Sequence, residues 1–194
     1  MEEPTTEHWA AVKHLLRYIA GTLHFGCRFE RSTGESRLIG YSDVDFAGDV
    51  DDRKSSSGMV FKLGGRAICW QTQKQKVIAL SSCEAEYIAA TTAACQSVWL
   101  RRMLGELLGQ AGGAATLYVD NKSAIQLCKN PVFHDRSKHI ETRFHFIREC
   151  VQDGKIAVEY VPTDEQLADI MTKALPKAKF QELRQELGVI NICS

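Results

Sequence analysis

The sequence predicts an α/β domain in which helices flank a mixed five-stranded sheet, and three features indicate this fold class. Two short β-prone runs, residues 58–63 and 66–71, are separated by Gly64-Gly65, a two-residue loop that favours an antiparallel hairpin. A long alanine-rich segment with the composition of a helix follows the hairpin. Residues 116–120 then form a short, largely apolar run that suits a buried parallel strand. Antiparallel strands, a helical crossover and a parallel strand together give a mixed sheet.

The first predicted element is a helix over residues 5–21, which ends near Gly21. Residues 22–36 are rich in turn formers and are interpreted as a short hairpin or linker. We therefore expect a boundary near residue 35, with a helix and linker over residues 1–35 and the sheet domain over residues 36–194. The helix is indicated by apolar residues at helical spacing, namely Trp9, Val12, Leu15, Leu16 and Ile19.

The first strand and the crossover helix have clear starting signals. Residues 38–43 begin a β pattern, and with the two runs of the hairpin they predict an antiparallel meander. The helix starts at a capping box, in which the Ser81 side chain accepts a hydrogen bond from a backbone N–H of the first turn and the Glu84 side chain reaches back to the backbone N–H of Ser81. It is expected to continue to about Leu108.

The remaining elements complete the sheet and cover it with helices. Pro131, Gly154 and Pro162 end the elements that precede them. The first, fourth and fifth strands are expected to be parallel. The predicted elements are a helix over 121–129, a helix over 137–153, a strand over 156–161, a helix over 163–174 and a last helix from Pro176.

The composition indicates a globular chain without a membrane segment. With 194 residues, of which 44% are apolar, the chain can form a real core. No run approaches the roughly 18 to 20 apolar residues that span a bilayer, and the start of the chain lacks the features of a signal peptide, so we expect a soluble, intracellular and cytoplasmic protein. Seven cysteines without a C-x-x-C pair predict reduced, mostly buried thiols. Trp70 and Trp99 are expected in the core.

The overall charge gives no case for nucleic-acid binding, because Lys plus Arg equals Asp plus Glu, at 24 each. The positions of the charged residues along the chain are more informative. Residues 62–80 contain four basic residues and no acidic residue. Such a strip suits contact with a polyanion backbone, although a solvated strand face would have the same composition.

Acidic residues in separate predicted elements suggest a metal site. One of them, Asp120, falls at the carboxyl end of a parallel strand, where ligands bind in sheets of this kind. Carboxylates that converge in space can hold Mg²⁺, a hard cation that prefers oxygen ligands. Two such ions can activate water and stabilise the leaving oxygen in phosphodiester chemistry. Each acid could equally be an ordinary surface residue. The residues in question are Asp43, Glu86, Asp120 and Asp169.

Motifs along the chain carry a family resemblance. In order, they are IGYSDVDFAGD, RKSSSG, ALSSCEAEYIAA, LYVDNKSAI, KNPVFHDRSKHIETRFHFIRE and YVPTDEQLADIMTKAL. They closely resemble the ribonuclease H domain of copia-type long-terminal-repeat retrotransposon Pol polyproteins, from about residue 37 to residue 176. The preceding segment HWAAVKHLLRYIAGTLHFGCRF resembles the end of the reverse transcriptase and its connection to the nuclease.

The resemblance implies a ribonuclease H-like fold and an endonuclease that hydrolyses the RNA strand of RNA/DNA hybrids. It implies catalysis by two Mg²⁺ ions, for which Mn²⁺ can substitute, held by Asp43, Glu86, Asp120 and Asp169. The products would carry 5′-phosphate and 3′-hydroxyl ends. The implied partners are the hybrid and the reverse transcriptase domain of the same polyprotein, and the implied location is a virus-like particle. Recognition of ribose 2′-hydroxyls would distinguish RNA from DNA.

Two neighbouring acids compete for these roles. Asp45 lies two residues after Asp43, and both would face the same side of a strand, so geometry alone cannot choose between them. The resemblance favours Asp43. Glu84 is already explained by the capping box, which favours Glu86. The loop over residues 161–166 lacks the histidine that cellular and bacterial ribonucleases H usually place before the last helix, so a remote histidine or none takes that role.

Polar residues outside the acidic set are expected to contact the backbone of the hybrid. A zinc site formed by Asp135, His139, Glu141 and His145 is disfavoured, because the two histidines are six residues apart and point to different sides of a helix. The expected nucleic-acid-binding residues are Arg53, Lys54, Lys74, Lys76, Asn121, Arg136, Lys138 and Arg143.

Two other functions remain open at this point. A non-catalytic module with the same fold could bind nucleic acid or a polyprotein partner, although the presence of all the acids argues against it. A DNA strand-transferring nuclease of the integrase kind shares the fold and the metals. The ADIMTK sequence and the leader that resembles reverse transcriptase disfavour this second alternative.

Overall fold

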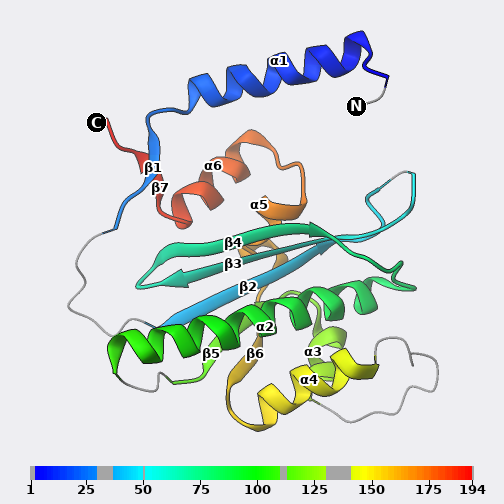
Figure 1. Ribbon diagram of the computed structural model, residues 1–194, viewed down its shortest axis with the longest axis vertical. Helices are drawn as coiled ribbons and strands as arrows, with labels where there is room; N and C mark the ends of the chain where they lie inside the picture. Colours follow the sequence, from blue (N-terminus) through cyan, green and yellow to red (C-terminus); the bar gives the residue numbers. More distant parts are fainter. Residues whose placement is uncertain (1–2, 30–36, 50, 110–112, 130–140, 194) are drawn as a thin grey trace.

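The computed structural model describes residues 3–29, 37–49, 51–109, 113–129 and 141–193, with the backbone alone for 141–144. A five-stranded sheet lies between two layers of helices (Figure 1). The first part of the chain contains α1 (Thr6–Gly21), β1 (Phe25–Cys27), β2 (Leu38–Asp45), β3 (Ser56–Leu63), β4 (Arg66–Lys74) and α2 (Ser82–Leu108). The second part contains β5 (Ala115–Val119), α3 (Lys122–Lys129), α4 (Glu141–Gln152), β6 (Ile156–Tyr160), the 3₁₀ turn η2 (Thr163–Glu165), α5 (Asp169–Thr172), α6 (Lys177–Glu186) and β7 (Val189–Asn191).

The sheet has the predicted mixture of strand directions. Its order is β4-β3-β2-β5-β6, in which β2, β3 and β4 form an antiparallel meander and β2, β5 and β6 are parallel. The β3–β4 hairpin turns at Gly64 and Gly65, whose φ angles are 58° and 82°. Two successive positive φ angles are the requirement of the primed turn that the glycine pair predicts.

Helix α2 is confirmed, with one difference at its start. The Ser81 side chain accepts a hydrogen bond from the Glu84 backbone N–H at 3.2 Å. The Glu84 carboxylate accepts from the N–H of Leu80 at 2.8 Å, one residue before the predicted partner. Gly109 ends the helix in the left-handed conformation. Along the helix, small buried side chains allow close packing on the sheet, among them Ala85, Ala89, Ala90, Ala93 and Ala94.

The core lies on both faces of the sheet. Apolar residues of α2, α3 and α4 pack on one face, and residues of α5 and α6 pack on the other. The expectation that Trp70 and Trp99 are core residues is wrong, since their exposures are 56% and 54%. Trp70 lies on the edge strand β4, and Trp99 projects from α2 between the buried positions Ser97 and Leu100. Only Cys128 and Cys150 are buried, so the expectation of mostly buried cysteines is also wrong.

The predicted helix over residues 163–174 is wrong in its extent. The segment instead contains the 3₁₀ turn η2 and the four-residue helix α5. Between them Gln166 has an extended backbone, and its side chain is fully buried. Its amide donates to the Ser42 carbonyl at 2.9 Å, and its amide oxygen accepts from the Ala168 N–H at 3.1 Å. These contacts tie the segment to β2, and tertiary contacts of this kind override helix propensity.

The sequence pattern missed two short strands. Phe25–Cys27 (β1) pairs antiparallel with Val189–Asn191 (β7), so part of the segment interpreted as a hairpin or linker is joined to the end of the chain. Helix α1 forms as predicted but has no buried residue. Figure 1 shows it set apart from the sheet. No described helix combines the length and the apolar character that a membrane crossing requires.

Candidate metal centre

Carboxylates from three elements meet at one end of the parallel strands. Asp43 lies on β2, Asp120 directly follows β5, and Glu86 lies in the first turns of α2. The β2–β5 register pairs Ser42 with Val119, which makes the next residue of each chain segment a neighbour across the sheet. One oxygen from each of Asp43, Glu86 and Asp120 lies within 4.8 Å of the others. Such convergence at the carboxyl edge follows from the parallel pairing of these strands.

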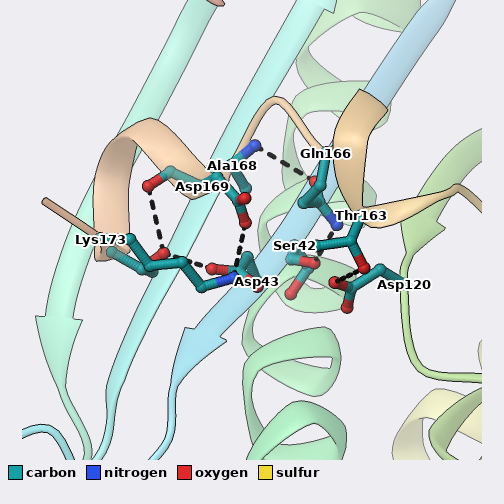
Figure 2. Close-up of polar contacts among 9 residues, drawn as sticks. Ser42, Asp43, Asp120, Thr163, Gln166, Ala168, Asp169 and Lys173 are labelled. Atoms are coloured by element: carbon teal, nitrogen blue, oxygen red, sulfur yellow. Dashed lines mark hydrogen bonds and ion pairs between the residues drawn. The ribbon is translucent and has the colours of Figure 1, made fainter. Parts of the chain in front are cut away.

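Asp169, at the start of α5, reaches the same site through a lysine. The Lys173 ammonium lies 2.7 Å from Asp169 Oδ1 and 3.0 Å from Asp43 Oδ1 (Figure 2). Asp43 and Asp169 are both buried. The Thr172 hydroxyl donates to the other oxygen of Asp43. The structure therefore brings Asp169 beside Asp43, although it is not one of the three mutually close carboxylates.

Burial and mutual repulsion perturb the titration of these acids. Burial raises the pKa of Asp43 to about 6, against the opposing effects of the Thr172 hydrogen bond and the Lys173 charge. Burial, followed by the charges of Asp43 and Asp120, raises the pKa of Glu86 to about 9. For Lys173, burial by itself lowers the pKa, but the hydrogen bonds and charges of Asp169 and Asp43 raise it above its ordinary value.

The donor set fits a divalent cation. All the candidate ligands are carboxylate oxygens, which are the ligands that Mg²⁺ and Mn²⁺ prefer. Glu86 Oε2 is buried and has no hydrogen-bond partner among the described residues. A buried oxygen without a donor, next to two more carboxylates, lacks the positive charge that a metal ion would supply. The assignment of the four acids as metal ligands stays a prediction.

The two competing acids lie outside this cluster. A Cβ atom at Gly48 would lie 1.9 Å from Asp45 Oδ2, which shows that the Asp45 carboxylate folds over the loop after β2. Glu84 is bound to the Leu80 N–H at the start of α2. The structure therefore groups Asp43 with Glu86, as the resemblance suggested.

The predicted nucleic-acid-binding residues have varied surroundings. Lys74 contacts Asp49 at 2.5 Å and Asp52 at 3.0 Å, and Lys54 contacts Asp52 at 3.2 Å. These lysines are thus neutralised by acids of the β2–β3 loop. Arg53, in the same loop, and Lys76, after β4, are exposed. Asn121 follows Asp120 and accepts from the Ala124 N–H at 3.0 Å, which caps α3.

Several residues named from the sequence lie outside the described part of the chain. Arg136 and Lys138 belong to this group, as do Asp135 and His139 of the disfavoured zinc site. The side chains of Arg143 and Glu141 also lie outside it. Their roles stay predictions. His145 is described and exposed.

The sequence interpretation missed the residues that hold the acids in place. Thr163, the first residue of the predicted helix over 163–174, donates from its hydroxyl to Asp120 Oδ2 at 3.1 Å (Figure 2). Gln166 anchors the turn before α5, and Thr172 and Lys173 bind Asp43. One local signal was present for Lys173, since an acid and a lysine four residues apart form an ion pair on a helix.

Comparison with known proteins identifies homologous transposon polyproteins. No family model matches the chain. The chain is 46% identical over 189 residues to the retrovirus-related Pol polyprotein from transposon TNT 1-94 of Nicotiana tabacum, covering 97% of this chain and 14% of that protein. It is 43% identical over 192 residues to the corresponding polyprotein from transposon RE2 of Arabidopsis thaliana, covering 99% of this chain and 13% of that protein. The chain thus spans a small part of the length of these relatives.

Solved structures show the same fold. The N-terminal RNase H domain of a Mycobacterium tuberculosis protein gives a TM-score of 0.52 at 13% identity, covering 78% of this chain and 98% of that one. LC11-RNase H1, solved in complex with an RNA/DNA hybrid, gives a TM-score of 0.52 at 14% identity, covering 70% of this chain and 94% of that one. At these identities the likeness concerns the fold alone. The chain is therefore homologous to a segment of the copia-type Pol polyproteins of transposons, and it has the ribonuclease H fold.

Proposed function

We propose that the chain is a metal-dependent endonuclease that hydrolyses the RNA strand of RNA/DNA hybrids during reverse transcription of a retroelement. The observation that carries this proposal is the convergence of carboxylates from β2, α2 and the end of β5, three of them within 4.8 Å of one another. A fourth, Asp169, joins them through Lys173. The homology to transposon Pol polyproteins and the ribonuclease H fold support the same reaction.

Asp43, Glu86, Asp120 and Asp169 would hold two Mg²⁺ ions, with Mn²⁺ as a substitute. When bound, such ions activate water and stabilise the charge on the leaving oxygen. The chain itself fixes the ligands before the ions arrive. Thr163 holds Asp120 at 3.1 Å, and Thr172 and Lys173 hold Asp43. Burial of Asp43 and Glu86 keeps water away from these carboxylates and strengthens their attraction for a cation.

The proposed substrate is a hybrid duplex gripped mainly by its backbone. Recognition of 2′-hydroxyls on one strand would select RNA for hydrolysis. Asn121 is a suitable contact because it directly follows Asp120. The other proposed contacts are Arg53, Lys54, Lys74, Lys76, Arg136, Lys138 and Arg143. Lys54 and Lys74 would exchange their present carboxylate partners for phosphates.

The first segment of the chain is proposed to connect this nuclease to a polymerase. In this interpretation residues 1–35 are the end of the reverse transcriptase connection and residues 36–194 are the nuclease domain. The exposed apolar residues of α1, including Trp9, Leu15 and Leu16, support a partner surface on that side. Virus-like particles are the proposed location, as the polyprotein homology suggests.

A substrate panel tests the proposal. Purified chain is incubated with a labelled RNA/DNA hybrid, duplex RNA or duplex DNA, in Mg²⁺, in Mn²⁺ or in chelator. We expect cleavage of the RNA strand of the hybrid only, with either metal and not in chelator. Asp120→Asn should abolish cleavage, because an amide cannot supply the anionic oxygen that a hard cation requires. Metal-dependent binding of hybrid without cleavage would instead favour a non-catalytic module.

A further inference from the structure

Lys173 lies where two of the four acids would share a cation. Its ammonium contacts Asp43 Oδ1 at 3.0 Å and Asp169 Oδ1 at 2.7 Å (Figure 2). The second oxygen of Asp43 accepts from the Thr172 hydroxyl. Both oxygens of Asp43 are therefore occupied by groups that come from the last turn of α5 and the residue that follows it.

The arrangement divides the acidic site into two unequal halves. In the first half, Asp43 and Asp169 already have a positive charge between them. In the second half, Glu86 has a buried oxygen without a hydrogen-bond partner among the described residues, and Asp120 is held by the neutral hydroxyl of Thr163. A cation entering the second half has no ion-paired ammonium to displace from Glu86 or Asp120 among the described residues. A cation that bridges Asp43 and Asp169 must take the place of the lysine.

The lysine has a route out of the site. Helix α5 ends at Thr172, and the Lys173 backbone is extended, with φ −120° and ψ 146°. About a third of its side chain is exposed, at 34%, so the ammonium can turn to solvent while the helix keeps its position. Lysine combines a point charge with a flexible four-carbon stem, which suits this movement.

We propose that Lys173 is a tethered cation that holds Asp43 and Asp169 together in the metal-free chain and is displaced when a metal ion bridges them. This inference rests on the proposed function only in taking the four acids as metal ligands. Because a metal ion must displace Lys173 there, the site between Asp43 and Asp169 would bind the metal more weakly than the other site and would be the last to fill. Lys173 thus sets the metal concentration at which the site is complete.

Metal titration of three variants tests the inference. Mn²⁺ binding is followed by the electron paramagnetic resonance signal of the free ion, for the wild type, Lys173→Met, Lys173→Arg and Lys179→Met. Lys179 is the control because it is also partly buried, and its ammonium contacts Glu182 at 2.9 Å and the Asp164 carbonyl, neither of which is a proposed metal ligand. Lys173→Met should tighten the weaker binding step by about 5- to 150-fold, the range that an ordinary coupling produces. Lys173→Arg and Lys179→Met should bind as the wild type does.

A second measurement keeps the inference testable if Lys173→Met does not fold. The wild-type chain is treated briefly with acetic anhydride, and acetylation of each lysine is quantified by mass spectrometry with and without Mn²⁺. We expect Lys173 to be protected in the metal-free chain and to become reactive when Mn²⁺ binds, whereas Lys179 does not change. Unchanged protection of Lys173 at saturating Mn²⁺, or an unchanged isotherm for a folded Lys173→Met variant, would overturn the inference.

These results separate the inference from the proposed nuclease activity. A chain that binds Mn²⁺ and releases Lys173 but cleaves no hybrid would refute the proposed function and leave the inference standing. A chain that cleaves hybrid while Lys173 stays protected would refute the inference alone.

Discussion

Among single residues, Glu86 is one for which burial and neighbouring charges strongly disfavour the ionised form. It is buried beside two other carboxylates, and its Oε2 has no hydrogen-bond partner among the described residues. The sequence placed Glu86 in the site through the family resemblance, and the capping box that accounts for Glu84 supported this choice. What the sequence could not give is the depth of burial, which depends on how closely α2 packs on β2.

The raised pKa of Glu86 predicts a dependence of stability on pH. Its pKa changes from an ordinary value of 4.5 to about 9 in the folded chain, so the folded chain retains a proton that the unfolded chain releases. Between these values unfolding releases protons, and the metal-free protein therefore becomes less stable as pH rises. Glu86→Gln should remove much of this loss and raise the melting temperature at pH 8 by several degrees.

Thermal unfolding in chelator at pH 5 and pH 8 checks this prediction. The exposed Glu159 provides a control, since Glu159→Gln should leave the pH dependence as it is in the wild type. An equal fall in melting temperature for Glu86→Gln and the wild type would show that Glu86 is not the group responsible.

Among the elements, those with local signals were predicted and those fixed by tertiary contacts were not. The glycine pair between β3 and β4 and the cap at Ser81 gave the hairpin and α2. Strands β1 and β7 have three residues each, which is too short for a pattern. The extent of α5 depends on Gln166, whose buried hydrogen bonds to β2 cannot be read from propensity.

Because α5 lies close to β3, a glycine on β3 should not tolerate a larger side chain. Gly58 pairs with Asp43 in the β2–β3 register. A Cβ atom at Gly58 would lie 2.6 Å from Thr172 Cγ2 and 2.8 Å from Met171 Cβ. Gly58→Ala should therefore push α5 outward, at a cost of about 1–3 kcal/mol for overpacking. It should also weaken Mn²⁺ binding, because α5 supplies Asp169.

The melting temperature measures the loss of stability, and a Mn²⁺ titration measures the loss of metal affinity. Gly113→Ala is the matched control, since a Cβ atom there has no neighbour within 4 Å. If Gly58→Ala behaved as Gly113→Ala does in both measurements, the position of α5 would not depend on the absence of a Cβ atom at residue 58.

For the molecule as a whole, the question is how a chain of zero net charge would bind the polyanion that is its proposed substrate. The parallel strands bring the acids to one end of the sheet. The basic residues of the strip over 62–80 are partly engaged elsewhere, since Lys62 donates to the Glu186 carbonyl and Lys74 pairs with Asp49. Composition could not predict this pairing, because it depends on the fold of the β2–β3 loop.

Salt dependence of hybrid binding tests the proposed role of Lys74 and Lys76. Replacing both with alanine should weaken binding to all sequences and flatten the plot of log K against log salt by about one to two units. Lys155→Ala is the control, because Lys155 precedes β6 at the opposite end of the parallel strands and pairs with Asp153. An unchanged slope in the double variant would move the binding surface to Arg136, Lys138 and Arg143.

The claim that the acidic cluster is a metal-dependent nuclease centre is tested most directly by comparing Asp43→Asn with Asp45→Asn. Both substitutions remove one charge from β2, but only Asp43 lies within 4.8 Å of Glu86 and Asp120. Single-turnover hydrolysis of an RNA/DNA hybrid is measured at saturating Mg²⁺, after circular dichroism has shown that both variants are folded. We expect Asp43→Asn to lose about a thousandfold or more in rate, because several kcal/mol of charge stabilisation disappear. Asp45→Asn should stay within about threefold of the wild type, as expected for a group that binds no metal ion. Equal losses in the two variants, or near wild-type hydrolysis by Asp43→Asn, would contradict the claim.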